Sequence, residues 1–318
     1  MLNAKISRKA FFKHCLSGLM ALAYSNTFLK TVFAATQDKA FNGRPKRPVS
    51  TDYDLVAVTG EDPYAMTVKA VKALGGMEKF VGKNSVVVIK PNIGWDRVPQ
   101  QAGNTNPQVV AALIDLSFEA GAGKVKIFDI TCNEARRCYA NSGIREAARD
   151  KRADIYFPDD WNIVKARFSF DSPMEGWPVL KDAIECDTFI NVPILKHHGL
   201  TNLTISMKNL MGVCGGNRGL IHRDIGRKLV DLTSFINPDL TVIDAFRVLV
   251  RNGPTGGDLG DVVDMRTILA GCDPTLADIY AARLMGVDPA SVPNIQNAIE
   301  RGIGNSDVDA ARIAELKA

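Results

Sequence analysis

Three of the four histidines in the chain flank one glycine-rich loop. His197 and His198 come shortly before the loop at 212–219, and His222 follows it. The backbone N–H groups of a glycine-rich loop can approach an anion closely, and neighbouring basic side chains supply positive charge. Histidine is also the side chain best suited to acid–base work near neutral pH. The cluster predicts an anion site in which His198 or His222 acts as the general acid or base.

Basic and amide residues follow the apolar runs at 86–89, 188–192 and 203–207. In open α/β sheets, ligands bind outside the carboxyl ends of the strands, so these residues should meet at one edge. Lysine and arginine would hold the charge of a small carboxylate or phosphate, and asparagine would orient it. The predicted ligand-binding residues are Lys90, Asn92, Asn191, Lys196, Lys208, Asn209, Arg218 and Arg223.

Asp244 ends the apolar run at 240–243 and completes the predicted catalytic set, in which it would orient a histidine or bind a metal. The same region offers an alternative metal site, with candidate ligands His198, His222, Cys214 and Asp244. Adjacent histidines on an extended chain point to opposite faces, so His197 and His198 would rarely ligate one ion together. We therefore favour anion binding over metal binding.

Several other sites are unsupported by the sequence. None of the five cysteines after residue 34 belongs to a C-x-x-C pair, so no iron–sulfur or zinc-ribbon motif is present. Cys132 and Cys138 could form a disulfide in an oxidising compartment. The chain has no G-x-S-x-G nucleophile elbow. The glycines at 121–123 lack the P-loop spacing, and Asp273 before Pro274 is typical of a helix N-cap.

The elements that must position these residues alternate along the chain. Apolar runs predict strands at 55–58, 86–89, 125–130, 188–192, 203–207, 240–243 and 267–270. Helical patterns lie at 64–75, 107–120, 142–150, 226–236, 275–285, 289–302 and 307–317. Strands that are apolar on both faces and separated by helices predict an α/β fold, with a mainly parallel sheet covered by helices on both faces. An irregular or antiparallel insertion is expected around 151–185.

The N-terminal residues 1–34 resemble an export signal. They carry five basic residues and no acid, then a weakly apolar core, and a small-residue cleavage site near Ala34. The box around Arg8 and Lys9 resembles a twin-arginine signal, with Lys9 where the second arginine belongs. This pattern predicts contact with the export machinery, through the twin-arginine or the general secretory route, and a periplasmic or otherwise exported location. A polar, Pro-rich linker at 35–53 and a single domain at 54–318 should follow.

Composition limits the class of protein. The chain has 318 residues, of which 46% are hydrophobic and 23% charged, and a net charge of +4. These values are those of a globular protein. The basic excess belongs to residues 1–34, and the remainder is nearly neutral with no basic run. Nucleic acid is therefore not an expected partner.

Longer strings of the sequence resemble the family catalogued as domain of unknown function 362. They are VVVIKPNIGW at 86–95, NTNPQVVAALIDLSFEAGAGKVKIFD at 104–129, DTFINVPILKHHGLTNLTISMKNLMG at 187–212, PDLTVIDAF with RNGPTGG within 238–257, and ILAGCDPTLADIYAARLMG at 268–286. The resemblance implies that the family's motif includes Lys90, Asn92, Asn191, Lys196, His198, Lys208, Asn209, His222, Asp244, Asn252 and Asp278. It supplies no reaction. Some members carry a ferredoxin-like cysteine cluster, which this chain lacks.

The leading hypothesis is an exported protein with an enzyme-like site for a small anionic ligand. An alternative is a redox or metal-binding accessory protein that works beside an iron–sulfur partner. A second alternative is a periplasmic ligand-binding module without catalytic activity. The sequence leaves open whether the protein is an enzyme, which cofactor it holds and whether a metal ion is one.

Overall fold

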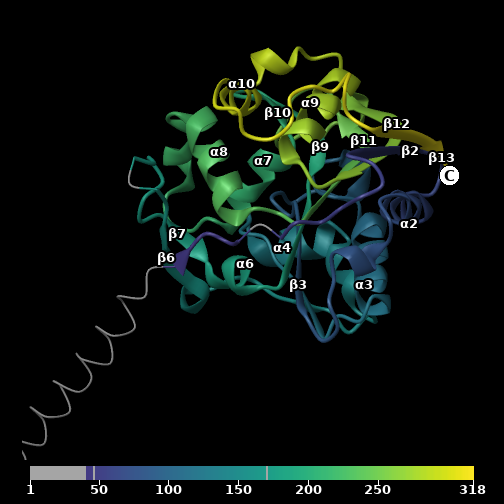
Figure 1. Ribbon diagram of the computed structural model, residues 1–318, viewed down its shortest axis with the longest axis horizontal. Helices are drawn as coiled ribbons and strands as arrows, with labels where there is room; N and C mark the ends of the chain where they lie inside the picture. Colours follow the sequence, from purple (N-terminus) through teal and green to yellow (C-terminus); the bar gives the residue numbers. More distant parts are fainter. Residues whose placement is uncertain (1–40, 46, 170) are drawn as a thin grey trace, which may run out of the picture. The chain divides into compact units, whose positions relative to one another are not determined.

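A mainly parallel β-sheet of ten strands forms the centre of the part of the chain that the structure describes (Figure 1). Its order is β13-β2-β12-β11-β8-β3-β4-β5, and β9 and β10 join beside β11. Only β12 and β10 run antiparallel to their neighbours. The strands are β2 (Leu55–Thr59), β3 (Val86–Pro91), β4 (Lys124–Ile127), β5 (Asp154–Ile155), β8 (Thr188–Val192), β9 (Ile194–His198), β10 (Asn202–Thr204), β11 (Leu240–Leu249), β12 (Val262–Gly271) and β13 (Ile313–Lys317).

The computed structural model describes residues 41–45, 47–169 and 171–318. The expected export signal at 1–34 and the first part of the expected linker lie outside these residues. Residues 42–318 form one compact unit. No helix within the described residues is long and apolar enough to cross a membrane.

Helices cover both faces of the sheet, as the sequence predicts (Figure 1). The α-helices are α2 (Pro63–Ala73), α3 (Pro107–Glu119), α4 (Ala135–Asn141), α5 (Ile144–Ala148), α6 (Lys181–Glu185), α7 (Ser206–Asn209), α8 (Ile225–Ile236), α9 (Pro274–Leu284) and α10 (Pro293–Glu300). Short 3-10 helices are η1 (Met77–Lys79), η2 (Pro99–Gln101), η3 (Asp160–Asn162), η4 (Leu210–Val213), η5 (Arg218–His222), η6 (Leu259–Asp261) and η7 (Pro289–Ser291).

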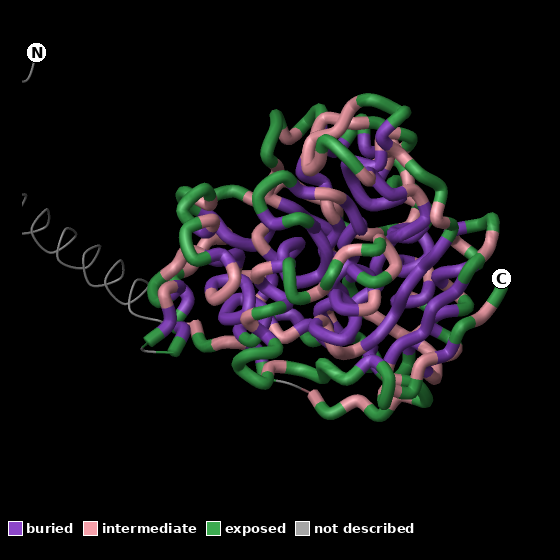
Figure 2. The backbone as a smooth tube through the Cα atoms, turned by 90° about the horizontal axis from the view of Figure 1, so that it is seen from above, coloured by how far each residue is buried: buried purple, intermediate pink, exposed green. Residues whose placement is uncertain are grey.

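Strand β3 shows why both faces are covered. Its side chains alternate, so that Val87 and Ile89 join the core cluster of α2, α3 and α5, whereas Val88 joins the cluster of α6, α7 and α8. All three are completely buried. The central strands β8, β9 and β11 are accordingly buried along most of their length, and Figure 2 shows buried backbone through the middle of the molecule. The continuous apolar runs in the sequence therefore correctly predict a sheet that is covered by helices on both faces.

The predicted helix start at Asp273 is confirmed. The Asp273 carboxylate accepts hydrogen bonds from the N–H groups of Thr275 at 2.8 Å and Leu276 at 3.2 Å, and Pro274 occupies the first turn of α9. An N-cap of this kind satisfies N–H groups that have no partner within the helix. The insertion is also confirmed, because β6 (Ile163–Arg167) and β7 (Pro178–Leu180) pair antiparallel within it.

Two predicted elements are wrong. The segment 307–317, predicted as a helix, ends in strand β13, which pairs in parallel with β2 along its whole length. Its short amphipathic pattern suits either structure, and the free edge of β2 supplies backbone partners that favour the strand. The run 203–207, predicted as one strand, ends as β10 at Thr204, and helix α7 begins at Ser206.

Part of the expected linker packs on the compact unit. Arg44 is buried, and its guanidinium lies 2.7 Å from the carboxylate of Asp239. Arg47 pairs with the same carboxylate at 3.1 Å and also donates to the Thr188 hydroxyl. A two-residue strand, β1 (Phe41–Asn42), begins this segment. The Asp239 carboxylate therefore anchors the chain between residues 44 and 47.

Candidate functional site

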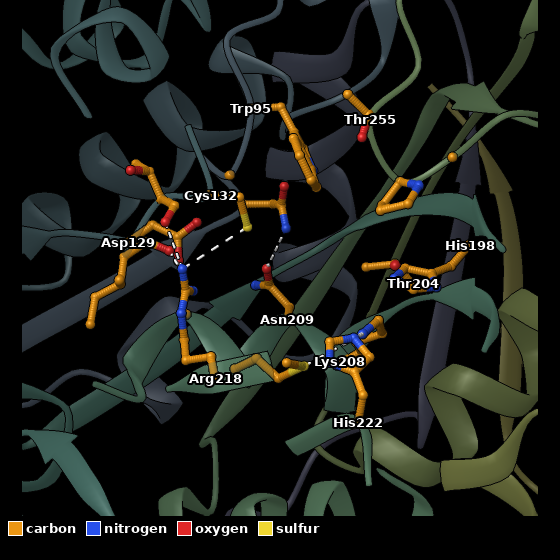
Figure 3. Close-up of a pocket in the computed structure, with 18 of the residues that line it drawn as sticks. Trp95, Asp129, Cys132, His198, Thr204, Lys208, Asn209, Arg218, His222 and Thr255 are labelled. Atoms are coloured by element: carbon orange, nitrogen blue, oxygen red, sulfur yellow. Dashed lines mark hydrogen bonds between the residues drawn. The ribbon is translucent and has the colours of Figure 1, made fainter. Parts of the chain in front are cut away.

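A cavity of about 680 Å³ opens at the carboxyl ends of β3, β4 and β9, between these strands and the segment from α7 to η5 (Figure 3). The strand-end rule predicts this location. The cavity brings together eight of the residues predicted from the sequence: Lys90, Asn92, Lys196, His198, Lys208, Asn209, Arg218 and His222.

Lys90 forms a buried ion pair with Asp129 in the wall of the cavity. Its Nζ lies 2.8 Å from Asp129 Oδ1, and both side chains are almost completely buried. The same Nζ donates to the carbonyl oxygen of Pro91 at 2.9 Å and to Asn209 Oδ1 at 3.1 Å. Lys90 therefore has two hydrogen-bond acceptors and one carboxylate at ion-pair distance, since Asp129 Oδ1 accepts no hydrogen bond within the described residues. Burial lowers the pKa of Lys90, and the Asp129 carboxylate opposes this shift.

Gly212 makes room for this ion pair. A Cβ atom at Gly212 would lie 1.7 Å from Asp129 Oδ1 and 2.5 Å from Lys90 Nζ. The loop backbone also contacts the strand end, because Gly212 accepts a hydrogen bond from the N–H of Ile130 at 2.9 Å. The glycine is needed here for close approach rather than for an unusual backbone angle.

Asparagines connect the ion pair to the cavity. Asn209 Oδ1 accepts from Asn92 Nδ2 at 3.1 Å, and Asn209 Nδ2 donates to Asn191 Oδ1 at 2.9 Å. Asn92 and Asn209 line the cavity, whereas Asn191 is fully buried behind Asn209 and donates to the Ser206 carbonyl oxygen. Asn191, predicted as a ligand-binding residue, therefore orients Asn209 rather than facing the cavity.

The alternation of β9 separates its polar side chains. Lys196 and His198, two residues apart, both line the cavity. His197 lies on the other face, where its Nδ1 accepts from the N–H of Gly253 at 3.1 Å. His198 Nδ1 accepts from the N–H of Leu200 at 3.1 Å, so in the neutral ring Nε2 carries the hydrogen. The expectation that the adjacent histidines diverge is therefore confirmed.

A second group of basic side chains, His198, Lys208 and His222, lies together in the cavity. Lys208 Nζ lies 3.4 Å from His222 Nε2, and the rings of His198 and His222 are stacked with centroids 6.0 Å apart. Figure 3 shows these three side chains together. Burial, aided by neighbouring positive charge, lowers the pKa of His198 to about 3, and burial also lowers the pKa of His222. Both rings are therefore neutral near pH 7.

Helix α7, which carries Lys208 and Asn209, begins on a distant carboxylate. Asp278 on α9 is fully buried and accepts from the N–H of Ser206 at 2.8 Å, the N–H of Met207 at 3.2 Å and the Ser206 hydroxyl at 2.5 Å. Burial raises the pKa of Asp278 to about 7, although the hydrogen bonds from these donors lower it. Asp278 thus positions two residues of the cavity without lining it.

Arg218 closes the cavity on the side of β4. Its guanidinium donates to the carbonyl oxygens of Ile130 at 2.7 Å and Thr131 at 2.6 Å, and Cys132 Sγ lies 4.0 Å from its Nη2. Cys132 is exposed and lines the cavity (Figure 3). Cys132 and Cys138, considered above as a disulfide pair, are both free thiols.

Three predicted site residues lie elsewhere. Asp244, predicted to orient a histidine or bind a metal, is buried away from the cavity, and its carboxylate accepts from the N–H groups of Asn106 at 2.8 Å and Phe246 at 3.0 Å. Cys214 is packed in the apolar cluster around α8, and burial raises the pKa of its thiol to about 12. Arg223 is exposed and does not line the cavity.

The predicted metal ligands are consequently not brought together. Asp244 and Cys214 use their side chains in backbone capping and in core packing, so that His198 and His222 share the cavity without either of them. Among the residues that the structure describes, no group of three or more His, Cys, Asp or Glu side chains could hold a metal ion. A site with two neutral imidazoles falls short of the usual set of metal ligands.

Sequence reasoning missed three cavity residues, Trp95, Cys132 and Thr204, and it did not assign Asp129 to the site. The prediction omits Asp129, although it lies near the end of the predicted strand at 125–130, and its pairing with Lys90 could have been inferred from adjacent strand ends. No feature of the sequence marks Thr204 as a site residue, because it lies within an apolar run that is typical of a buried strand.

Comparisons with known proteins place the chain among relatives. The model of the family described as Domain of unknown function (DUF362) matches residues 87–283. The thylakoid-associated protein sll1697 of Synechocystis sp. is 30% identical over 235 residues, which cover 71% of this chain and 70% of that protein.

Two solved structures also match. The lactate racemase apoprotein from Thermoanaerobacterium thermosaccharolyticum is 13% identical, with a TM-score of 0.45 over 80% of this chain. A protein from Thermotoga maritima is 11% identical, with a TM-score of 0.33 over 62% of this chain. The chain spans 63% of the length of the first and 54% of the second.

Proposed function

This chain belongs to the DUF362 family, and on that premise we propose that it is an enzyme with a site for a small anionic ligand, a carboxylate or a phosphate. One observation carries the proposal. Within the described residues, four basic side chains line the cavity, namely Lys90, Lys196, Lys208 and Arg218, and Asp129 is the single carboxylate there. Asp129 balances Lys90, so that in the part of the chain that the structure describes Lys208 and Arg218 have no carboxylate in the cavity even when Lys196 is uncharged. Burial of charge without a counter-charge is costly, so the excess favours an anion as the ligand.

The basic residues have different roles in this proposal. Lys90 forms an ion pair with Asp129 and donates hydrogen bonds to two neutral acceptors, and it therefore supports the wall. Among the described residues, the hydrogen-bond partners of Lys208 Nζ are Met211 Sδ and His222 Nε2, both at a long 3.4 Å, so that the ammonium can still donate to an anion. Burial lowers the pKa of Lys208 to about 8, which leaves most of it charged near pH 7. Lys208 and Arg218 are the residues we expect to hold the anion.

The acid–base role falls to His222. Its Nε2 lies beside Lys208, and the ring is half-buried, so it can reach both the ligand and solvent. His198 stacks on it and offers a neutral Nε2–H as a hydrogen-bond donor. Asp244 has no part in this arrangement, because its carboxylate contacts backbone N–H groups.

The experiment is calorimetric titration of the purified protein with oxalate and with inorganic phosphate at low salt. We expect one of these probes to bind the wild type and to bind Lys208→Met roughly ten- to a hundredfold more weakly, the loss of one charged hydrogen bond. Lys228→Met is the matched control. Lys228 is also a largely buried lysine, but it donates to the Leu220 carbonyl oxygen outside the cavity.

Equal weakening in both variants, or no binding of either anion to the wild type, would refute the anion site. Tight binding without any turnover of bound carboxylates or phosphates would assign the site to a ligand-binding module instead of an enzyme.

The N-terminal pattern supports a further part of the proposal, export of the protein. Residues 1–34 combine a basic start, a weakly apolar core and small residues before the expected cleavage site near Ala34. Expression of the full chain in a bacterium, followed by fractionation and N-terminal sequencing, tests it. A shortened chain outside the inner membrane is the expected result, and a full-length cytoplasmic chain contradicts it.

A further inference from the structure

Lys196 differs from the other lysines of the cavity in its partners. It is 1% exposed, and none of the ion pairs found among the described residues includes it. Its Nζ donates to the carbonyl oxygen of Gly103 at 2.6 Å and to Asn92 Oδ1 at 3.3 Å. The ring of Trp95 lies beside it, with its centroid 5.9 Å from Nζ. The amine is thus held from two sides by neutral acceptors.

This count of partners suits an unprotonated amine. A neutral amine has two N–H bonds and one lone pair, whereas an ammonium has three N–H bonds and no lone pair. Two acceptors use both N–H bonds of the neutral form and leave the lone pair free. Lys90, which pairs with a carboxylate and donates hydrogen bonds to two neutral acceptors, provides the contrast within the same cavity.

The surroundings of Lys196 also favour the unprotonated amine. Burial lowers the pKa of Lys196 to about 7, and the positive charges of Lys208 and Lys90 contribute, while Cys132 and Asp129 oppose the shift. A desolvated lysine beside other cations is the usual form of a nucleophilic amine.

Thr204 supplies an independent observation at the same place. In the register of β9 and β10, Thr204 lies directly opposite Lys196, so both side chains are on one face. The Thr204 hydroxyl is buried, lines the cavity and has no hydrogen-bond partner among the described residues. A buried hydroxyl of this kind normally finds a partner, which points to a polar atom of a ligand beside Lys196.

We propose that Lys196 Nζ attacks the carbonyl carbon of a small 2-oxo carboxylate and forms an imine with it. This inference rests on the proposed anion site, because Lys208 and Arg218 would hold the carboxylate of the same molecule. The Thr204 hydroxyl donates to the carbonyl oxygen of the substrate. The substrate class therefore combines a carbonyl for the amine with an anion for the basic wall.

The step balances without a further reactant. The nitrogen lone pair forms the C–N bond, and the π electrons of the carbonyl move to its oxygen, which takes up one proton while the amine releases one. The second N–H proton then leaves with the hydroxyl group as water, and C=N remains. His222, next to Lys208, lines the same cavity and can relay these protons.

Reductive trapping tests the inference. The full chain is incubated with pyruvate and, separately, with propanal, which has no carboxylate, each with sodium cyanoborohydride near pH 7. Peptide mapping by mass spectrometry then locates secondary amines. We expect one pyruvate adduct on Lys196, formed at least about tenfold faster than on any exposed lysine, and slowed by added oxalate.

Three variants refine the test. Lys196→Met removes the adduct, and Lys228→Met keeps it. Thr204→Val preserves the shape of the side chain, lacks the hydroxyl and slows trapping several-fold. Because the adduct is mapped in the wild type, the result does not depend on any variant folding.

Oxalate or phosphate binding without an adduct on Lys196 overturns the imine and leaves the anion site standing. An adduct on Lys196 that forms equally fast with propanal and ignores oxalate overturns the oxo acid assignment and speaks against the anion site. Adducts spread evenly over the exposed lysines overturn the inference altogether.

Discussion

Lys90 Nζ and Asp129 Oδ1 lie 2.8 Å apart at the ends of two adjacent parallel strands, β3 and β4, where both side chains are almost completely removed from solvent. A buried ion pair contributes little net stability, but loss of one partner leaves an uncompensated buried charge. The pair also fixes Asn209 and, through it, Asn92. The geometry of the cavity therefore depends on a single carboxylate.

Asp129→Ala should destabilise the protein strongly. The variant leaves the Lys90 ammonium buried without its carboxylate, which costs roughly 3–5 kcal/mol. Urea unfolding followed by circular dichroism measures the change. Asp154→Ala is the control, because Asp154 pairs with Lys124 at 3.2 Å where both side chains are about half exposed, and there the loss should be about 1 kcal/mol or less. Similar losses in both variants would contradict the account of the pair.

Gly212→Ala should disrupt the same contact from the loop side. The added Cβ overlaps Asp129 Oδ1 and Lys90 Nζ, so the pair or the loop must move, at a cost of roughly 1–3 kcal/mol. Gly199→Ala, also in the cavity wall, is the control, since its Cβ would meet nothing closer than 3.9 Å. We expect weaker oxalate binding and lower stability only in Gly212→Ala. An unchanged unfolding curve for that variant would show that the loop yields without strain.

Lys196 should make stability depend on pH above neutrality. Its pKa is about 7 in the folded chain and lies near 10.5 when unfolded, so the unfolded state binds more protons between these values. Stability due to this group therefore rises as the pH increases from about 7 to about 10.5. Urea unfolding of the wild type and of Lys196→Met across this range should give a difference that grows with pH. A constant difference would mean that the amine titrates normally.

Asp278 should produce the opposite slope at lower pH. Its pKa is raised to about 7 in the folded chain from 3.8, so the folded state binds more protons between these values. The contribution of this group is complete below about pH 4 and is lost as the pH rises through 7. Asp278→Asn should remove this slope, and the comparison with the wild type isolates it from other carboxylates.

The variant Asp278→Ala tests whether Asp278 positions Lys208 without itself binding the ligand. It removes the acceptor for the N–H groups of Ser206 and Met207, which should cost about 1–3 kcal/mol, and it releases the start of the helix that carries Lys208. Oxalate affinity should fall although Asp278 does not line the cavity. Undiminished affinity would show that Lys208 is positioned by other contacts.

Much of this arrangement could be predicted from the sequence. The strands at 86–89 and 188–192 and the helices that cover them follow from local hydrophobic patterns. The helix start at Asp273 followed from a local hydrogen-bonding preference. Lys90 and Asn92 followed from the strand-end rule. Lys208 and Asn209 were predicted after a strand that in fact ends at Thr204, and they lie on helix α7. Each of these inferences uses interactions between residues that are close along the chain.

The tertiary structure decided what the candidate residues do. Asp244 and Lys90 both lie on β-strands of the sheet. The carboxylate of Asp244 accepts hydrogen bonds from backbone N–H groups, whereas Lys90 forms an ion pair with Asp129 from the adjacent strand end. The strand at 313–317 exists because β2 offers it a free edge.

The sequence by itself determined the fold class and most of the basic residues of the cavity, because hydrophobic periodicity marks the strands and the basic residues cluster after the apolar runs and around the glycine-rich loop. The face-to-face register of Lys196 and Thr204 and the capping of α7 by Asp278 came only from the tertiary structure. Side-chain partners depend on strand register and on loops brought together from distant parts of the chain, and neither leaves a local pattern in the sequence.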